Sequence, residues 1–364
     1  MKTIDEISKT EHGRELVGIL THMLDPTQND NFQNKYFTGI NIDLSNVLFI
    51  LSYNDPSEID KVLLDHVHRN KFNSLSIEEK LHIAKQFVIP EYEKTFGLQN
   101  AFNFSIENYT LEPGIRKFKE LLYIIIGEIN LEILNCKNNK TFPIDITYED
   151  VQTKYLSDKY PIVKQLIHTE DEVGIMNSLF AASSGHSDVL AATSKFVYSD
   201  KMFDLNLTGL LDEMMKESFQ ISFTIAYNVL SAECKEKLNK RHTESKDVGI
   251  HMHMGDGSIN KSGTSAGIAI TILLYSLLSN RKIRHDYATT GEASDLNGKV
   301  GEIGALRYKF IGGIKAGVKH LIFPENNSHE YHEFIEKYKN NPFIDGVTFH
   351  PVSHIIQVIE LIVI

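Results

Sequence analysis

Ser265 is the first residue whose surroundings suggest chemistry, because it stands between Gly263 and Gly267, directly before an apolar stretch that runs to about residue 278. Small neighbours let a substrate backbone approach a serine hydroxyl, and the first turn of a helix offers free N–H groups that stabilise an oxyanion. The segment therefore predicts a serine nucleophile. A second interpretation stays open at this point: Ser262 or Thr264 caps the helix and the glycines only form a tight turn.

The same segment satisfies the Gly-x-Ser-x-Gly pattern of an α/β-hydrolase nucleophile elbow. That fold requires a strand directly before the serine, followed later in the chain by an acid and a histidine. Asp286 and His320 are the nominal residues for these two roles. Residues 255–263 have the composition of a loop, which counts against the elbow.

His251 and His253 form a second group with chemical potential. They alternate within a strand-like segment, so both imidazoles would lie on one face and suggest a metal site. Because no third or fourth ligand lies at a familiar spacing, we expect no metal there. The favoured interpretation is that the two histidines are structural or line the active site.

The composition is that of an ordinary globular chain of 364 residues, with 42% apolar residues, 23% charged residues and a net charge of −11. These values exclude disordered, collagen-like and disulfide-scaffold classes, and they argue against a broad nucleic-acid surface. The two cysteines, Cys136 and Cys234, are far apart. With no signal-peptide pattern at the start and no apolar run long enough to span a bilayer, we expect a cytoplasmic protein that binds neither membrane nor nucleic acid.

Hydrophobic periodicity divides the chain into three regions. A loop at 25–30 and a strand-like run at 47–51 indicate an α/β unit, whereas residues 76–88 and 114–136 have the spacing of helices. In the C-terminal half, strand patterns at 203–207, 248–254, 321–323 and 347–349 surround a predicted helix over 210–230. We therefore expect an α/β domain at 1–72, a helical domain at 73–140, a linker without a core pattern at 141–170, and an α+β domain at 171–364.

Several blocks in the C-terminal half carry a family resemblance. They lie at residues 207–210, 213–218, 251–254, 263–269, 290–292, 304–309 and 312–315. In this order they closely resemble the proteolytic domain of Lon proteases, in which a serine and a lysine form the catalytic dyad. The resemblance implies that Ser265 is the nucleophile and Lys309 the base. Ser262 and Thr264 stand where the family often has an acidic residue and a proline, and neither of those groups transfers the proton.

Ser–Lys chemistry requires a lysine with a lowered pKa, because a serine hydroxyl is a poor nucleophile until a base takes its proton. Residues 306–311 predict an apolar helix that would bury Lys309 and favour its neutral amine. By the resemblance, Thr290 hydrogen-bonds near the dyad and positions Lys309, and His251 supports the site. Glu213 matches a family carboxylate near the active site, although a helix carboxylate is more often simply solvated.

The first third resembles the later part of the Lon AAA+ ATPase module. Asp5 and Glu6 resemble the end of a Walker B strand, Asn54 a sensor asparagine, and Arg116 the second sensor in a helical lid. No Gly-x-x-x-x-Gly-Lys-Ser/Thr motif occurs in the 364 residues, and His66 stands where the family supplies an arginine finger. The resemblance implies ATP and Mg²⁺ as cofactors, but without this Walker A motif we predict that the chain alone does not hydrolyse ATP.

The expected architecture is therefore a truncated AAA+ core (α/β) and an all-α lid, followed by an α+β peptidase domain of Lon type. The expected function is a serine endopeptidase that cleaves unfolded proteins or peptides. The resemblance implies a homo-oligomer, a hexamer in the family, and a partner chain carrying Walker A would complete the ATPase. Two alternatives remain: a catalytically silent Lon-like scaffold, or one half of a split ATP-dependent protease.

Overall fold

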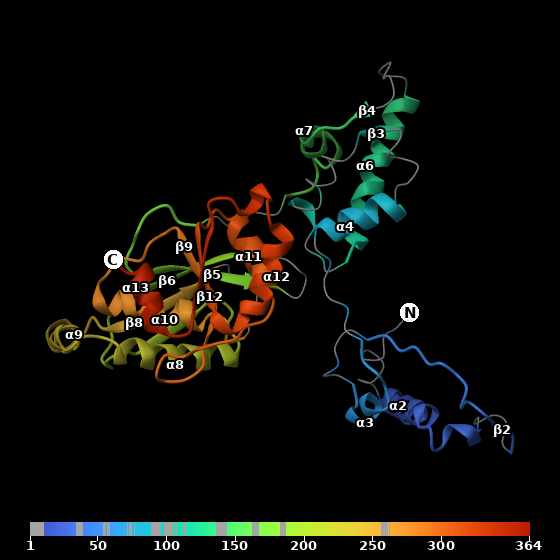
Figure 1. Ribbon diagram of the computed structural model, residues 1–364, viewed down its shortest axis with the longest axis horizontal. Coiled ribbons are helices and arrows are strands. Elements are labelled where there is room, and N and C mark those ends of the chain that lie inside the picture. The colour runs from blue at the N-terminus through green and yellow to red at the C-terminus, as the bar shows by residue number, and fades with distance from the viewer. Residues whose placement is uncertain are drawn as a thin grey trace. The chain divides into compact units, whose positions relative to one another are not determined.

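The computed structural model of the chain is shown in Figure 1. It describes residues 11–33, 39–53, 56, 59–70, 72, 75, 77–88, 96–97, 105, 108–110, 112, 114–135, 144–161, 167–182, 187–255, 261 and 263–364. The chain divides into two compact units, residues 1–73 and residues 74–364. Among the described residues, no helix is long and apolar enough to cross a membrane.

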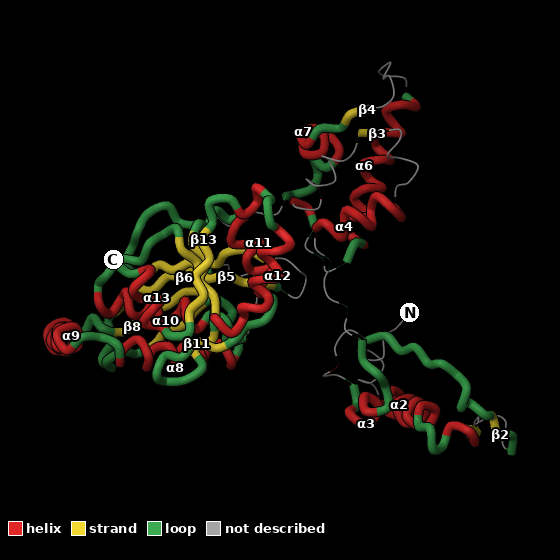
Figure 2. The backbone as a smooth tube through the Cα atoms, in the orientation of Figure 1, coloured by secondary structure: helices red, strands yellow, loops and turns green. Residues whose placement is uncertain are grey.

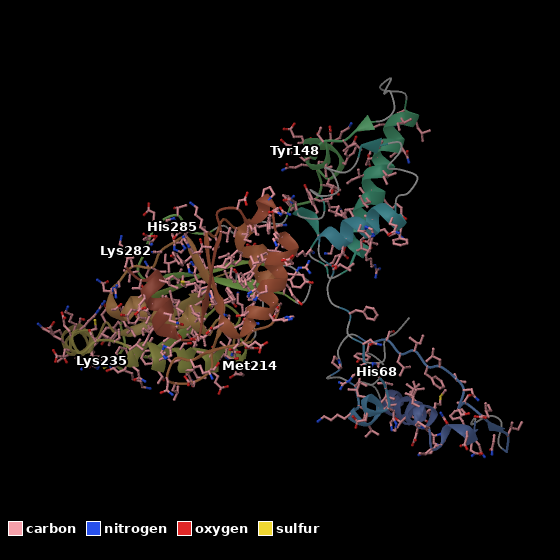
Figure 3. The ribbon with its side chains drawn as sticks, viewed as in Figure 1. His68, Tyr148, Met214, Lys235, Lys282 and His285 are labelled. Carbon is pink, nitrogen blue, oxygen red and sulfur yellow. The ribbon has the colours of Figure 1, made fainter. Side chains whose placement is uncertain are left out.

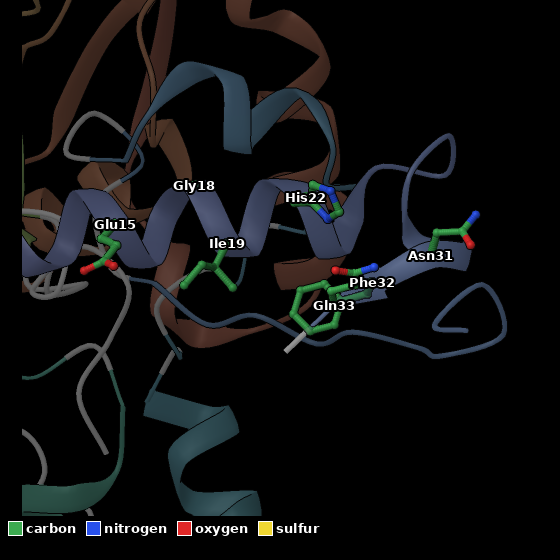
Figure 4. Close-up of a pocket in the computed structure, with 7 residues that line it drawn as sticks. All are labelled: Glu15, Gly18, Ile19, His22, Asn31, Phe32 and Gln33. Atoms are coloured by element: carbon green, nitrogen blue, oxygen red, sulfur yellow. The ribbon is translucent and has the colours of Figure 1, made fainter. Parts of the chain in front are cut away.

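The first unit is built around helix α2 (Glu11–Leu24) and the short helix α3 (Lys61–Asp65). Val17 of α2 packs against Ile59 and Leu63, which form the small core of this unit. A 3₁₀ turn (Asn29–Asn31) leads into the antiparallel pair β1 (Phe32–Gln33) and β2 (Asn41–Ile42). An open pocket of about 470 Å³ lies against α2 and residues 31–33 (Figure 4).

The strand expected at residues 47–51 is absent from the structure. The segment is irregular, and the side chains of Leu48 and Ile50 are 84% and 86% exposed. A strand is stable only when its backbone N–H and C=O groups find a ladder partner, and no described residue pairs with this segment. The prediction was therefore wrong for 47–51, because this apolar run meets neither a sheet nor a buried core among the described residues. Asp5, Glu6 and Asn54 lie outside the described residues.

The helical region contains α4 (Ile77–Ile83), which continues into a π-helical turn (Ala84–Val88), and the long helix α6 (Arg116–Leu134). Two short strands, β3 (Phe96–Gly97) and β4 (Ile144–Asp145), pair in parallel. One apolar face of α6 is buried, as its 3.6-residue periodicity predicts. The buried residues of that face are Phe118, Leu121, Leu122, Ile125, Ile126 and Ile129.

Part of the segment expected to be a linker is packed into this helical core. Residues 146–156 pass through α7 (Tyr148–Asp150) and a π-helical turn (Val151–Tyr155), and Ile146, Val151 and Leu156 are buried against α6. The prediction of a linker without a core was wrong for these residues. Their apolar positions fall on two short turns of different pitch, so no single period links them in the sequence.

A seven-stranded mixed sheet forms the centre of the C-terminal region (Figure 2). Its strand order is β13-β12-β9-β5-β6-β8-β7, in which β6 runs antiparallel to its neighbours β5 and β8 and all other neighbouring strands are parallel. The strands are β5 (Ile175–Ala181), β6 (Ser187–Val197), β7 (Leu205–Thr208), β8 (Gly249–Met254), β9 (Tyr287–Thr289), β12 (His320–Pro324) and β13 (Thr348–Val352). The four strand patterns found in the C-terminal half of the sequence correspond to β7, β8, β12 and β13.

Helices cover both faces of this sheet. One face carries α8 (Glu213–Asn228), α9 (Ala232–Ser245), α10 (Gly267–Ser279) and α13 (Ile355–Ile362), and the other carries α11 (Leu306–Lys315) and α12 (Ser328–Tyr338) (Figure 1). Each face of the sheet has its own core. Because side chains alternate along a strand, Ile322 of β12 packs into the core on the α10 face, whereas Leu321 and Phe323 pack into the core on the α11 face. A two-stranded ribbon, β10 (Glu292–Ala293) and β11 (Val300–Gly301), follows β9.

Candidate active site

Thr290 occupies the first position after β9, at the carboxyl end of that strand. Its side chain is fully buried, and its backbone N–H donates to the carbonyl oxygen of Ile322 on the neighbouring β12 over 3.0 Å. The sheet therefore fixes the Thr290 backbone between the helices of the two faces.

Lys309 lies in the first turn of α11, and only 4% of its surface is exposed. Its Nζ donates a hydrogen bond to Oγ1 of Thr290 over 3.0 Å. Burial lowers the pKa of this lysine from 10.5 to about 8, and the negative charge of Glu330 opposes part of that effect. A sizeable fraction of Lys309 is therefore a neutral amine near pH 8, which is the form that accepts a proton.

Ser265 lies in the turn directly before α10, and its carbonyl oxygen is bonded twice. It accepts the hydroxyl of Thr290 over 3.2 Å and the backbone N–H of Gly291 over 2.8 Å. The carbonyl of Gly291 in turn accepts the N–H of Ile268 over 3.0 Å. These bonds join the start of α10 to the end of β9, so the serine and the lysine approach Thr290 from opposite faces of the sheet.

The first turn of α10 carries no side-chain cap. Its N-cap is Ala266, and the N–H of Gly267 donates to the carbonyl of Thr264. Thr264 therefore does not cap this helix, while Ser262 lies outside the described residues. A Cβ at Gly267 would come within 2.5 Å of the backbone nitrogen of Ala293, so glycine is required for the close approach of α10 to β10.

The geometry around Ser265 also disagrees with a nucleophile elbow. Residues 263 and 264 form a bend, whereas an elbow needs a strand directly before the serine. His320 stacks on Tyr287 with ring centroids 4.3 Å apart and lies 3.7 Å from Asp286. His320 and Asp286 therefore already interact with each other at the start of β12.

Glu213 has the geometry of a solvated carboxylate. It occupies the first position of α8, its side chain is 89% exposed, and its Oε1 lies 2.6 Å from Nζ of Lys216. The next residue, Met214, is 56% exposed on the same turn (Figure 3). No described contact links Glu213 to Ser265 or Lys309, so its place in the active site stays a prediction.

His251 and His253 share one hydroxyl, that of Thr208 on the neighbouring strand β7. Oγ1 of Thr208 lies 3.1 Å from Nε2 of His251 and 2.9 Å from Nδ1 of His253. Because a hydroxyl can donate one hydrogen bond and accept another, it can satisfy both rings. Within the described part of the chain, no three His, Cys, Asp or Glu residues are grouped as a metal site requires.

Two residues at the start of α12, the helix packed against α11, were not selected from the sequence. Asn327 is 2% exposed, and its amide donates to Oε1 of Glu330 over 2.9 Å. Glu330 contributes the one charge that raises the pKa of Lys309 against the effect of burial. An Asn before a helix and a Glu in its first turn indicate only a helix start, so the sequence contains no signal that links them to Lys309.

The described residues provide little test of nucleotide binding. Of the residues that the resemblance assigns to ATP and Mg²⁺, only Arg116 and His66 are described. Arg116 has a side chain that is 92% exposed and lies 3.5 Å from Glu120, and His66 follows α3 as its C-cap. ATP and Mg²⁺ therefore stay a prediction.

Comparison with known proteins decides the family. The model of the Lon protease (S16) C-terminal proteolytic domain matches residues 145–364. The chain belongs to the Lon protease family. This finding confirms the resemblance and the presence of a Lon proteolytic domain, and the α/β-hydrolase alternative is wrong.

Curated Lon proteases align with nearly the whole chain. The Lon protease homolog of Acanthamoeba polyphaga mimivirus is 30% identical over an alignment of 424 residues, gaps included, which covers 98% of the chain and 40% of the relative. The Lon protease of Campylobacter concisus is 32% identical, covering 89% of the chain and 42% of the relative. The Lon protease of Chlamydia pneumoniae is 30% identical, covering 98% of the chain and 43% of the relative. The chain thus spans less than half the length of these Lon proteases.

Proposed function

We propose that the chain is a serine endopeptidase of Lon type, in which Ser265 is the nucleophile and Lys309 the general base. The observation that carries this proposal is the buried lysine whose Nζ bonds the hydroxyl of Thr290, which itself bonds the carbonyl oxygen of Ser265. Membership of the Lon family supports the same assignment.

In the proposed reaction, the neutral amine of Lys309 takes the proton of the Ser265 hydroxyl as the oxygen attacks a peptide carbonyl. The resulting ammonium then donates that proton to the leaving amine, which departs as the new N-terminus of the downstream peptide. Water attacks the acyl ester with the same lysine as base, and the serine is regenerated. The first two N–H groups of α10, those of Gly267 and Ile268, already donate to the carbonyls of Thr264 and Gly291, so the oxyanion would be stabilised by other donors near Ser265.

Thr290 is the positioning residue of this proposal. Its Oγ1 accepts from Nζ and its hydroxyl proton goes to the Ser265 carbonyl, so one side chain fixes the lysine relative to the serine backbone. His251, held by Thr208, and Glu213, at the start of α8, keep the supporting roles that the resemblance implies. Substitution of each by glutamine tests those roles separately from the dyad.

The proposed substrates are unfolded polypeptides, and the proposed assembly is a homo-oligomer, a hexamer as in the family. A cytoplasmic location also belongs to this proposal. ATP and Mg²⁺ would supply unfolding work in the family, but no Walker A motif occurs in these 364 residues. We therefore propose that the chain by itself hydrolyses no ATP, and that a partner chain with Walker A would be needed for coupling.

The alternative of a silent scaffold differs from the proposed peptidase in what it requires of Lys309. A buried lysine with a pKa of about 8 costs stability at neutral pH, roughly 3 kcal/mol from the difference between 8 and 10.5. A scaffold gains nothing from that cost, whereas a peptidase needs the neutral amine. The buried amine of Lys309 therefore favours an active peptidase over a silent scaffold.

The experiment is the cleavage of an unstructured peptide by the wild-type chain, Ser265→Ala, Ser265→Cys and Lys309→Met. The proposal expects activity in the wild type, some activity in Ser265→Cys, and none in the other two. Parallel reactions with ATP and Mg²⁺ test whether nucleotide changes the rate, and we expect no change with the chain alone. Activity that survives Ser265→Ala would overturn the proposal.

A further inference from the structure

A carboxylate is held by hydrogen bonds beside the segment that leads into α11. The side chain of Asn327 makes three hydrogen bonds: Oδ1 accepts the N–H of Ile303 over 3.0 Å, and Nδ2 donates to the carbonyl of Ile303 over 2.8 Å and to Oε1 of Glu330 over 2.9 Å. Because Asn327 is buried, these bonds are shielded from water. The Glu330 carboxylate is thereby held relative to residue 303, which precedes α11 by only a few residues.

Packing brings the same acid toward the helix of the lysine. The ring of Phe310 on α11 contacts the ring of Phe334 on α12 edge to face, with centroids 5.3 Å apart, and both are buried. Lys309 is the neighbour of Phe310, and Glu330 precedes Phe334 by one helical turn, so Glu330 lies on the face of α12 that meets α11. Its charge reaches Lys309, where it favours the ammonium form.

Other ionisable groups also lie on α11 and on the elements packed against it. The elements packed against α11 are β5, β6 and α12 and, through the ring of Phe310, the strands β12 and β13. Strand β5 has no ionisable side chain, and Asp188 of β6 accepts the N–H of Val189. The remaining ionisable residues of these elements and of α11 itself are Lys195, Arg307, Tyr308, Lys315, His320, His329, Tyr331, His332, Glu333, Glu336, Lys337, Tyr338 and His350. Of all these groups, Glu330 is the one whose charge alters the pKa of Lys309.

This arrangement matters when the lysine accepts a proton. A positive charge then forms in a buried site, where the hydrogen bond from Nζ goes to the neutral hydroxyl of Thr290. We propose that Glu330 is a positioning residue of the proteolytic site, whose carboxylate, oriented by Asn327, stabilises the ammonium of Lys309 that forms when Ser265 loses its proton. This inference rests on the proposed function of the dyad.

The test is the pH dependence of kcat/KM for an unstructured peptide, measured with the full chain carrying Glu330→Gln, Glu330→Asp or Glu333→Gln. The amide in Glu330→Gln still accepts a hydrogen bond from Asn327, so the fold is retained while the charge is lost. We expect its acidic limb to move to lower pH by about half a pH unit or more. We also expect kcat/KM on the alkaline plateau to fall about threefold to tenfold, because the base is weaker.

The two other variants are controls. Glu330→Asp keeps the charge and should restore a profile close to the wild type. Glu333 lies on the same helix, but its side chain is 69% exposed and pairs with His329, so Glu333→Gln should not move the limb. An unmoved acidic limb in active Glu330→Gln would overturn the inference, as would an equal shift in Glu333→Gln.

A direct titration separates this inference from the function it rests on. The ¹³Cε resonance of Lys309 can be followed by NMR in the Ser265→Ala chain with and without Glu330→Gln, where no cleavage is needed. A lower titration midpoint in the double variant supports the role of Glu330 even if the wild-type chain cleaves nothing, in which case only the proposed function fails. Identical midpoints overturn the role of Glu330 whatever the peptidase assay gives.

Discussion

Lys309 and Thr290 come from different layers of the protein and meet in one hydrogen bond, in which Nζ donates to Oγ1 over 3.0 Å. The lysine belongs to a helix on one face of the sheet, and the threonine follows a strand within it. Since the same hydroxyl reaches the carbonyl of Ser265, the relative position of base and nucleophile depends on this one side chain.

Replacement of Thr290 by valine should remove the hydroxyl that links Lys309 to the Ser265 carbonyl, while the volume of the side chain stays nearly the same. Thr290→Val leaves Nζ of Lys309 without its hydroxyl partner, and we expect kcat/KM to fall about tenfold or more, since a lost bond to a buried charged group costs 1.5–3 kcal/mol. Thr290→Ser keeps the hydroxyl and should retain most activity. Steady-state cleavage of a peptide measures both, and wild-type rates in Thr290→Val would contradict the positioning role.

The peptidase activity should rise with pH through the titration of Lys309. Below pH 8 the lysine is mostly an ammonium ion and cannot accept the serine proton, and above pH 8 it is mostly neutral. We therefore expect kcat/KM to reach half of its maximum near pH 8. A profile measured from pH 6 to pH 9.5 checks this, and a midpoint near 6.5 would instead indicate a histidine base.

Lys309→Met should abolish cleavage and stabilise the fold. The folded pKa of about 8 lies below the unfolded value of 10.5, so the unfolded chain binds more protons between these values and stability rises with pH across that range. At pH 7 the full cost of burying the amine is present. Removing it should raise the free energy of unfolding by about 1–3 kcal/mol, after allowing for the lost bond to Thr290. Chemical unfolding at pH 7 measures this difference, and a less stable variant would show that the amine is not strained by burial.

Gly312→Ala should loosen the contact between α11 and β6. A Cβ at Gly312 would lie 2.5 Å from the backbone nitrogen of Asp188 and 2.5 Å from the carbonyl carbon of Ser187, and backbone atoms cannot easily move away. We expect a loss of about 1–3 kcal/mol in stability, with reduced activity because Lys309 lies one turn earlier on the same helix.

Gly127→Ala is the matched control for that substitution. Gly127 lies within α6, and a Cβ there would meet no atom within 4 Å. Alanine should therefore raise stability by about 0.5–1 kcal/mol through the better helix propensity. Thermal unfolding of both variants compares the two effects, and equal stability of Gly312→Ala and wild type would contradict the packing argument.

The parts of the site that the sequence reveals are those with a strong local pattern. Glycines on both sides of Ser265 and the apolar helix around Lys309 can be recognised in single segments, and the alternating strands β8 and β12 fall where they were expected. Local pattern failed at residues 47–51, an apolar run that pairs with no described strand, and at Ile146, whose burial depends on α6. Asn327 and Glu330 were missed for a related reason, since their relation to Lys309 arises only when α12 packs against α11.

The most direct test of the account is degradation of one unfolded protein by the wild-type chain and by Lys309→Met at pH 8.5, followed by mass spectrometry of the products. The account predicts peptide products from the wild type, none from Lys309→Met, and a fold at least as stable in the variant as in the wild type. Equal degradation by a folded Lys309→Met chain would contradict the assignment of Lys309 as the base.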